Sequence, residues 1–162
     1  MIEAGERIPS VPIKLVTSEG VADSTSDAAL AGERVVFFTV PGAFTPTCHV
    51  NHLPGFLANA AKLKAAGVSK IVCGAVNDHH VVKSWAEATD ALGRIEFIAD
   101  GRGRLTEALG LDKEMGDLGR RSARSAMIIE NGVVRSVFVE DKPGVTGSGA
   151  PAILMALEAA AG

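Results

Sequence analysis

The residues best placed to do chemistry in this chain are the run Pro41-Gly42-Ala43-Phe44-Thr45-Pro46-Thr47-Cys48. An apolar run at 34–40 precedes it and predicts a buried strand, and a helical pattern follows it. Cys48 is therefore expected in the first turn of a helix, where free backbone N–H groups and the helix dipole favour a thiolate over a thiol. This placement predicts a nucleophilic cysteine rather than a small buried hydrophobe.

Other residues of the same run are expected to shape the surroundings of the sulfur. Pro41 and Pro46 stiffen the turn and keep it out of the preceding strand. Thr45 stands three positions before Cys48, close enough for its hydroxyl to reach the sulfur. The run thus predicts a rigid turn that presents one hydroxyl and one thiolate on the same side.

The spacing Pro-x3-Thr-x2-Cys, extended as PGAFTPTC and followed by HLPGF, resembles the active-site signature of the peroxiredoxins. The extended form is similar to their peroxiredoxin-5-like, or atypical type II, subfamily. The likeness covers nearly the whole chain, from Gly5-Glu6-Arg7-Ile8-Pro9 to the last predicted helix. It implies a thioredoxin-like α/β fold, with a central mixed β-sheet flanked by helices.

The resemblance also implies an activity, a thiol-dependent peroxidase. In this reading Cys48 attacks hydrogen peroxide or an alkyl hydroperoxide and becomes a sulfenic acid, which an external thiol reduces. Glutathione with glutaredoxin, or thioredoxin, are the reductants that the family suggests. A homodimer is implied as well, and no metal, haem or flavin is required.

Site residues carry over where the motif matches. In the family, the hydroxyl at Thr45 and the backbone N–H of Cys48 contact the peroxide oxygens, and Pro41 shields the site. Arg124 stands at the position of the catalytic arginine, in the segment 118–127. Its guanidinium never deprotonates and offers several donors in a fixed fork, so it can hold a sulfur and a peroxide oxygen together. Ser125 replaces an aromatic residue common after that arginine.

A cation is needed on physical grounds too. A lower thiol pKa raises the thiolate fraction but also weakens the nucleophile, so thiolate formation alone does not give a fast peroxidase. The remaining rate must come from orienting the peroxide and stabilising charge as the O–O bond breaks. Arg120, Arg121 and Arg124 are the candidates for this task. The resemblance implies that Arg124 performs it, whereas Arg120 and Arg121 are expected in a solvated basic loop.

Cys73 lies within an apolar strand-like run at 71–76 and has two interpretations. It is either a buried small residue or a resolving cysteine that attacks oxidised Cys48, as the resemblance to plant-type members allows. Reaching Cys48 from mid-strand requires local unfolding, which favours the buried interpretation. The four histidines invite a metal site, but no CxxC or HExxH motif accompanies them, and we expect His52 to pack or hydrogen-bond near the helix start.

Composition excludes several other functions. The net charge of −3 gives no attraction to nucleic acid or to an anionic membrane, and no apolar run is long enough to span a bilayer. Two cysteines and a polar beginning without an apolar signal segment suit a reducing compartment, so we expect a cytoplasmic protein. Two alternatives stay open: a thioredoxin-type dithiol oxidoreductase, disfavoured without CxxC, and a non-enzymatic redox sensor.

The length and the order of the expected elements fit one domain over residues 1–162. Alternating strands and helices, followed by a hairpin at Asn131-Gly132 and a last helix, predict a mixed sheet with helices on its faces. We expect a helical turn at 24–31 and a kink at Pro54 in the helix after Cys48. The expected strands lie at 13–16, 35–40, 71–76, 95–99, 126–129 and 133–139.

Overall fold

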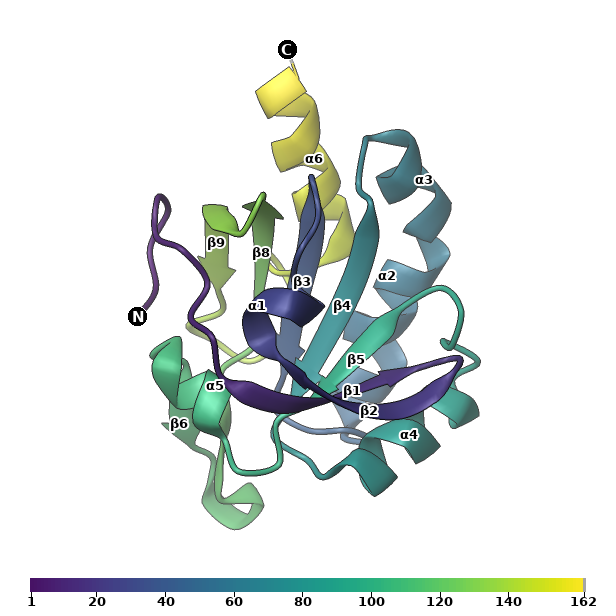
Figure 1. Cartoon of the computed structure of the whole chain (residues 1–162), viewed down its shortest axis with the longest axis vertical. Coiled ribbons are helices and arrows are strands. Elements are labelled where there is room, and N and C mark those ends of the chain that lie inside the picture. Colours follow the sequence, from purple (N-terminus) through teal and green to yellow (C-terminus); the bar gives the residue numbers. More distant parts are fainter. Residues whose placement is uncertain (162) are drawn as a thin grey trace.

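The computed structural model of the chain describes residues 1–161 and has a seven-stranded mixed sheet with helices on both faces (Figure 1). The strands lie side by side in the order β2-β1-β5-β4-β3-β8-β9. Their bounds are β1 Pro12–Thr17, β2 Gly20–Thr25, β3 Val35–Val40, β4 Lys70–Ala75, β5 Glu96–Ala99, β8 Ser125–Glu130 and β9 Val133–Val139. Two short strands, β6 Asp112–Glu114 and β7 Arg120–Ser122, pair with each other in a separate ribbon.

The helical segments are shorter and more numerous than the sequence predicts. The α-helices are α1 Ser26–Ala29, α2 Leu53–Ala58, α3 Ala60–Ala65, α4 His79–Ala88, α5 Arg104–Ala108 and α6 Ala150–Ala161. A π-wound segment, η1, covers Cys48–His52, and a 3-10 turn, η2, covers Gly116–Leu118. Of the described helices, none is long and apolar enough to cross a membrane.

The middle of the sheet confirms the predicted α/β architecture. β3 pairs in parallel with β4, and β4 pairs in parallel with β5, while β8 runs antiparallel to β3. All six residues of β3 are buried, because helices cover both faces of the sheet at this point. The carboxyl end of β3 is therefore held rigidly, and it feeds directly into the turn that begins at Pro41.

Side chains alternate between two apolar cores along the central strands. Phe38 and Val40 face the core that α2, α3, α4 and α6 cover, whereas Val35 and Phe37 face the core shared with α1 and α5. Figure 1 shows these two groups of helices on opposite sides of the sheet. Cys48 and Cys73 belong to the first core.

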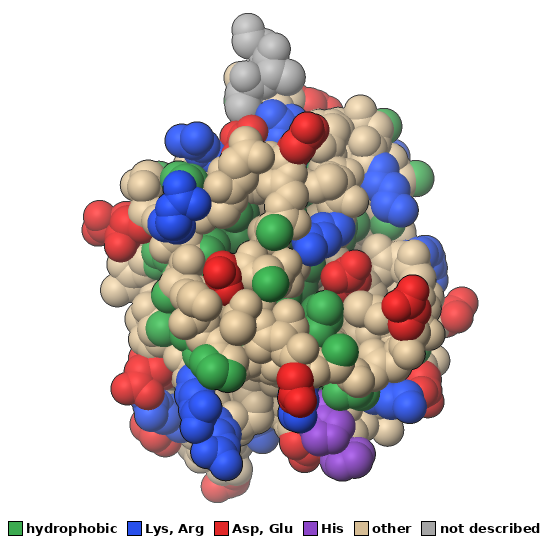
Figure 2. Space-filling view, viewed as in Figure 1, with side chains coloured by type: hydrophobic (Ala, Val, Ile, Leu, Met, Phe, Trp, Pro, Cys, Tyr) green, Lys and Arg blue, Asp and Glu red, His purple; other side chains and the backbone are tan. Residues whose placement is uncertain are grey.

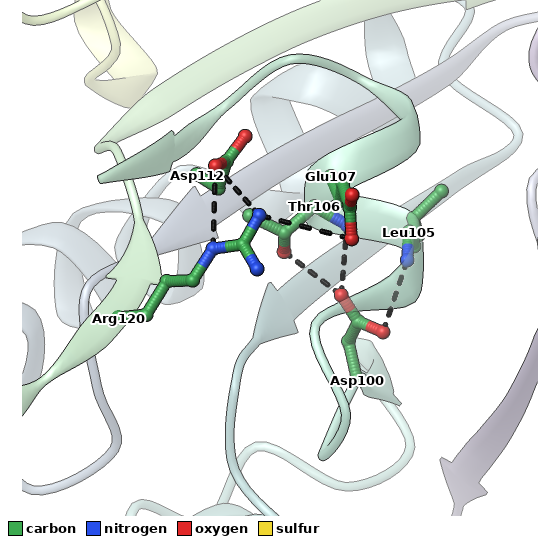
Figure 3. Close-up of polar contacts among 6 residues, drawn as sticks. All are labelled: Asp100, Leu105, Thr106, Glu107, Asp112 and Arg120. Atoms are coloured by element: carbon green, nitrogen blue, oxygen red, sulfur yellow. Dashed lines mark hydrogen bonds and ion pairs between the residues drawn. The ribbon is translucent and has the colours of Figure 1, made fainter. Parts of the chain in front are cut away.

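Local signals explain most element boundaries. Asn131 and Gly132 take positive φ values of 52° and 81°, which confirms the tight hairpin between β8 and β9. Asp78 caps α4 by accepting hydrogen bonds from the N–H groups of His80 and Val81. Asp100 binds the beginning of α5 in the same way, and Figure 3 shows its carboxylate facing the N–H groups of Leu105 and Thr106.

The predicted helical turn at 24–31 is wrong at its beginning. Residues 24 and 25 end β2, and α1 starts only at Ser26, whose hydroxyl bonds the N–H of Val11. β2 lies at the edge of the sheet and its residues are exposed or half-buried, so the strand has no buried apolar face for a pattern to reveal. Figure 2 shows acidic and basic side chains interspersed over the face that it presents.

Candidate active site

The chain after β3 turns into a helix two residues before Cys48, as expected. Pro46 and Thr47 are helical, and the N–H of His49 donates to the carbonyl of Thr45 at 2.8 Å. From Cys48 to His52 the helix is wound as a π-helix, and the N–H of Leu53 bonds the carbonyl of Cys48, five residues earlier. π-wound turns inside helices are frequent at functional sites.

The single kinked helix predicted after Cys48 is replaced by three segments. Pro54 has no N–H to donate, so the regular helical ladder cannot pass through it, and the π-wound turn lies immediately before it. A second break falls at Asn59, whose side-chain amide donates to the carbonyl of Gly55 at 2.8 Å. The prediction located the irregularity near Pro54 but not its form.

Cys48 lies at the centre of the candidate site and is fully buried. Its sulfur accepts a hydrogen bond from Nη2 of Arg124, at 3.2 Å. Arg124 is itself nine-tenths buried and lies between β7 and β8, at the entry to the strand that pairs with β3. The guanidinium therefore places a positive charge and a hydrogen-bond donor against a fully buried sulfur.

The same guanidinium holds a second partner that the sequence did not assign to it. Nη1 of Arg124 lies 3.0 Å from Nδ1 of His52, and Nε2 of His52 lies 2.8 Å from the carbonyl oxygen of Ser148. Burial, with a smaller contribution from the charge of Arg124, lowers the pKa of His52 to about 4. His52 is therefore neutral at pH 7, accepts at Nδ1 and donates at Nε2.

Aromatic rings enclose His52. Its ring lies 4.9 Å from the ring of Phe38 and 5.6 Å from that of Phe56, and the two phenylalanines stack on each other at 4.1 Å. This packing confirms that His52 packs and hydrogen-bonds near the helix start. The sequence did not identify Arg124 as the partner of His52.

Thr45 takes a different hydrogen bond from the one expected. Its hydroxyl donates to the carbonyl of Gly42 at 2.7 Å rather than to the sulfur of Cys48. The same carbonyl of Gly42 also accepts from the backbone N–H of Thr45, at 3.4 Å, so both groups of Thr45 stabilise the turn. With its proton engaged, the Thr45 oxygen is left as an acceptor for a hydrogen-bond donor such as a peroxide.

The sequence predicted that Arg121 lies in a solvated loop, and this prediction is wrong. Arg121 instead contacts the outside of the turn that begins at Pro41. It lies on β7, donates to the carbonyl of Leu118 at 2.9 Å, and donates to the carbonyl of Pro41 at 3.3 Å. A Cβ at Gly42 would stand 2.8 Å from Nη1 of Arg121, so a larger residue there would displace this guanidinium. Pro41 is thereby held at its carbonyl, and the residue also lines the pocket beside Thr45 and Arg124.

Arg120 points to the other side of the ribbon. Figure 3 shows its guanidinium between Asp112 and Glu107, at 2.7 Å and 3.7 Å respectively. The hydrogen bond from Arg120 lowers the pKa of Asp112. Both groups are exposed enough for water to screen the pair, so Arg120 has a local structural contact and no link to the site.

A pocket of about 440 Å³ leads to this group of residues. Its lining includes Pro41, Thr45 and Arg124, and Cys48 lies behind them. The remaining walls come from the first residues of the helix, from the β6–β7 ribbon and from the loop after β9. These residues are Pro46 and Thr47, then Lys113, Glu114, Met115 and Leu118, and then Glu140, Lys142, Pro143 and Gly144. The site is thus approached from one side by a small molecule.

Cys73 occupies a different environment in the same core. It lies in β4, in register with Phe38 on one neighbouring strand and Phe97 on the other. Burial, followed by the nearby charge of Cys48, raises the pKa of Cys73 well above its usual value. Both cysteines are free thiols.

Among residues 1–161, no three His, Cys, Asp or Glu side chains are grouped to hold a metal ion.

Comparison with known proteins agrees with the sequence resemblance. The Redoxin family profile matches residues 3–154. Peroxiredoxin-2D of Arabidopsis thaliana is 38% identical over 159 residues, which cover 96% of this chain and 98% of the relative. Peroxiredoxin-2C of Oryza sativa subsp. japonica is 40% identical with the same coverage of both. The crystal structure of reduced Prx3 from Vibrio vulnificus in complex with H2O2 superposes with a TM-score of 0.91, at 44% identity, over 97% of this chain and 99% of that one.

Proposed function

This chain belongs to the peroxiredoxins, within the Redoxin family, and is a thiol-dependent peroxidase; from that premise we propose that Cys48 is the residue that attacks the peroxide. The observation that carries this proposal is the 3.2 Å contact between Nη2 of Arg124 and the sulfur of Cys48, beside a pocket lined by Pro41 and Thr45. Within residues 1–161 no side chain donates a hydrogen bond to the sulfur of Cys73, which is buried in a strand, so the sequence resemblance and the local chemistry select the same sulfur.

The reaction follows from the positions of these groups. The Cys48 thiolate attacks the terminal oxygen of hydrogen peroxide or of an alkyl hydroperoxide. An S–O bond forms as the O–O bond breaks, and the leaving oxygen takes a proton from water to become water or an alcohol. The sulfur supplies the two electrons that reduce the peroxide, and it is itself oxidised to a sulfenic acid.

Each neighbour has a distinct task in this step. Arg124 stabilises the negative charge that moves from the sulfur to the leaving oxygen. Thr45 accepts a hydrogen bond from the peroxide O–H, because its own proton is engaged by Gly42. Pro41 limits access of water to the sulfur. Because Cys48 is fully buried behind these residues, a small shift of the pocket wall must accompany entry, and hydrogen peroxide needs a smaller shift than a bulky hydroperoxide.

We propose that an external thiol, and not Cys73, regenerates Cys48. The thiol attacks the sulfenic sulfur, water leaves, and a second thiol reduces the mixed disulfide. Glutathione with glutaredoxin, or thioredoxin, are the candidate reductants. The full burial of Cys73 and its raised pKa support this assignment, because a neutral thiol locked in a strand reacts poorly. A homodimer and a cytoplasmic location complete the proposal and rest on the resemblance and on cysteine usage.

The test is NADPH-coupled peroxide consumption, run in parallel with the thioredoxin and the glutaredoxin systems. We expect sustained turnover with at least one system, and none with Cys48→Ser. A single stoichiometric oxidation without turnover in either system would instead support a redox sensor. Sedimentation of the reduced protein over a concentration series tests the homodimer separately.

A further inference from the structure

Arg124 is held at both ends of its guanidinium. Nη2 donates to the sulfur of Cys48, and Nη1 donates to Nδ1 of His52. The two bonds fix the plane of the group, because rotation about the arginine side chain would break at least one of them. His52 is thus the only described residue whose contact opposes the sulfur on the same guanidinium.

His52 is in turn held by the loop that follows β9. The carbonyl of Ser148 accepts from Nε2 of His52 at 2.8 Å. Glu140 shapes this loop, since its carboxylate accepts from the N–H groups of Thr146 and Ser148, at 3.0 Å and 3.1 Å. The N–H of Glu140 also donates to the backbone carbonyl of Arg124, at 2.9 Å. The loop and the arginine are therefore connected through the backbone and through the histidine.

We propose that His52 is a positioning residue that, supported by the Glu140–Ser148 loop, aims the guanidinium of Arg124 at Cys48 and at the leaving peroxide oxygen. This inference rests on the proposed role of Arg124. It connects the loop, which also forms a wall of the pocket, to the reacting sulfur through His52 and Arg124.

A purely structural role for His52 would rest on its ring packing alone. Phe38 and Phe56 would pack equally well against an apolar side chain of similar size. Instead, both ring nitrogens are engaged, and a cation is placed against a buried ring that must stay neutral to accept from it. Those features have a use if the acceptor at Nδ1 orients Arg124.

Two amide substitutions can separate the hydrogen bond that His52 makes at Nδ1 from the one that it makes at Nε2. In His52→Asn the side-chain oxygen reaches the position of Nδ1, so it keeps the acceptor for Arg124 and loses the bond to Ser148. In His52→Gln the amide nitrogen reaches the position of Nε2, so it keeps the bond to Ser148 and loses the acceptor. The pair therefore tests orientation of Arg124 against anchoring of the loop.

The readout is the single-turnover rate of Cys48 oxidation by hydrogen peroxide, from rapid-quench mass spectrometry, with the melting temperature of each variant beside it. We expect His52→Gln to slow oxidation about tenfold or more, the scale of one hydrogen bond to a charged group, and His52→Asn to slow it about threefold or less. The melting temperatures should follow the opposite order. Rates that fall in parallel with melting temperature in both variants would overturn the proposal.

Two further variants separate this inference from the function on which it rests. In an Arg124→Ala background, His52→Gln should change the rate less than about twofold, because no guanidinium remains to be aimed. A tenfold loss there would contradict the positioning role. If Arg124→Ala itself leaves the rate unchanged, the assignment of Arg124 fails first. Glu140→Gln, which weakens the support of the loop, should slow oxidation by less than His52→Gln does; an equal or larger loss would place the control in Glu140 instead.

Discussion

Cys48 and Cys73 share one apolar core and are both inaccessible to solvent, yet their chemical surroundings differ completely. Cys48 begins a π-wound turn, bonds a guanidinium and lies behind a pocket. Cys73 lies in the middle of a parallel strand, where its backbone is bound into the sheet and burial raises its pKa. Burial alone therefore does not decide whether a cysteine is reactive. The donor beside the sulfur and the element that carries it decide.

The comparison is tested most severely by removing each sulfur in turn, beginning with Cys48. Cys48→Ser should abolish peroxide turnover while the melting temperature and circular dichroism remain close to those of the wild type, because serine fits the same volume. Coupled turnover with both reductant systems measures the effect. Activity near wild type in a folded Cys48→Ser protein would eliminate the proposed nucleophile.

Thr45 lines the pocket on the Cys48 side of the core, and its removal should have the next largest effect. Thr45→Val keeps the shape and removes the hydroxyl, so kcat/KM for peroxide should fall by a factor equivalent to about 2–4 kcal/mol. Steady-state kinetics over a range of peroxide concentrations measure it. A change of less than twofold would exclude Thr45 from the mechanism.

His52 should make the free energy of unfolding depend on pH. Its pKa is lowered to about 4 in the folded protein, against about 6.5 when unfolded, so between these values the unfolded state binds more protons. The free energy of unfolding should therefore fall by up to about 3 kcal/mol as the pH drops from 6.5 to 4, and then level off. Urea unfolding at stepped pH measures this, with His52→Asn as the control that lacks the titrating ring. Equal pH profiles for the two proteins would show that His52 is not the source.

The two arginines near the site form a matched pair, because both touch the turn but only Arg124 touches sulfur. Arg124→Ala should slow single-turnover oxidation of Cys48 by hydrogen peroxide by a factor equivalent to about 2 kcal/mol. Arg121→Ala removes one hydrogen bond to Pro41 and should change this rate little. A larger loss at Arg121 would mean that fixing the turn matters more than the charge beside the sulfur.

Cys73→Ser should have the smallest effect on turnover with external thiols. Wild-type protein treated with one equivalent of hydrogen peroxide should carry a sulfenic acid or a mixed disulfide at Cys48. Mass spectrometry of the non-reduced digest distinguishes this from a Cys48–Cys73 bond. A dominant peptide linking the two cysteines, together with lost turnover in Cys73→Ser, would make Cys73 the resolving residue.

The central sheet could be predicted because its signals are local. β3 and β4 are mostly apolar and almost entirely buried, and Asn131-Gly132 is a tight-turn pair whose conformation few other residues adopt. The β6–β7 ribbon could not be predicted in the same way. Its strands are three residues long, and no residue of β6 is buried, so neither burial nor alternation leaves a pattern in the sequence.

In the candidate site, too, the contacts between residues close in sequence could be predicted and most of those between distant residues could not. Pro41, Thr45 and Cys48 are close in sequence, so their spacing alone brings them together on one turn. Arg124 reaches Cys48 across 76 positions and was placed by resemblance, not by pattern. The contact of His52 with Arg124, and that of Ser148 with His52, depend on how a loop folds back over the helix. Such contacts are tertiary, and no propensity or periodicity encodes them.

Trp85 is the only tryptophan in a chain without tyrosine, and its indole N–H donates to Nδ1 of His49 at 3.0 Å. His49 is the residue after Cys48, on the π-wound turn. The ultraviolet emission of the protein therefore comes from one buried indole coupled through a single hydrogen bond to the turn that carries the reactive sulfur. Any unwinding of that turn breaks or lengthens this bond, so the intrinsic fluorescence of the unlabelled protein reports the motion of its own reactive centre.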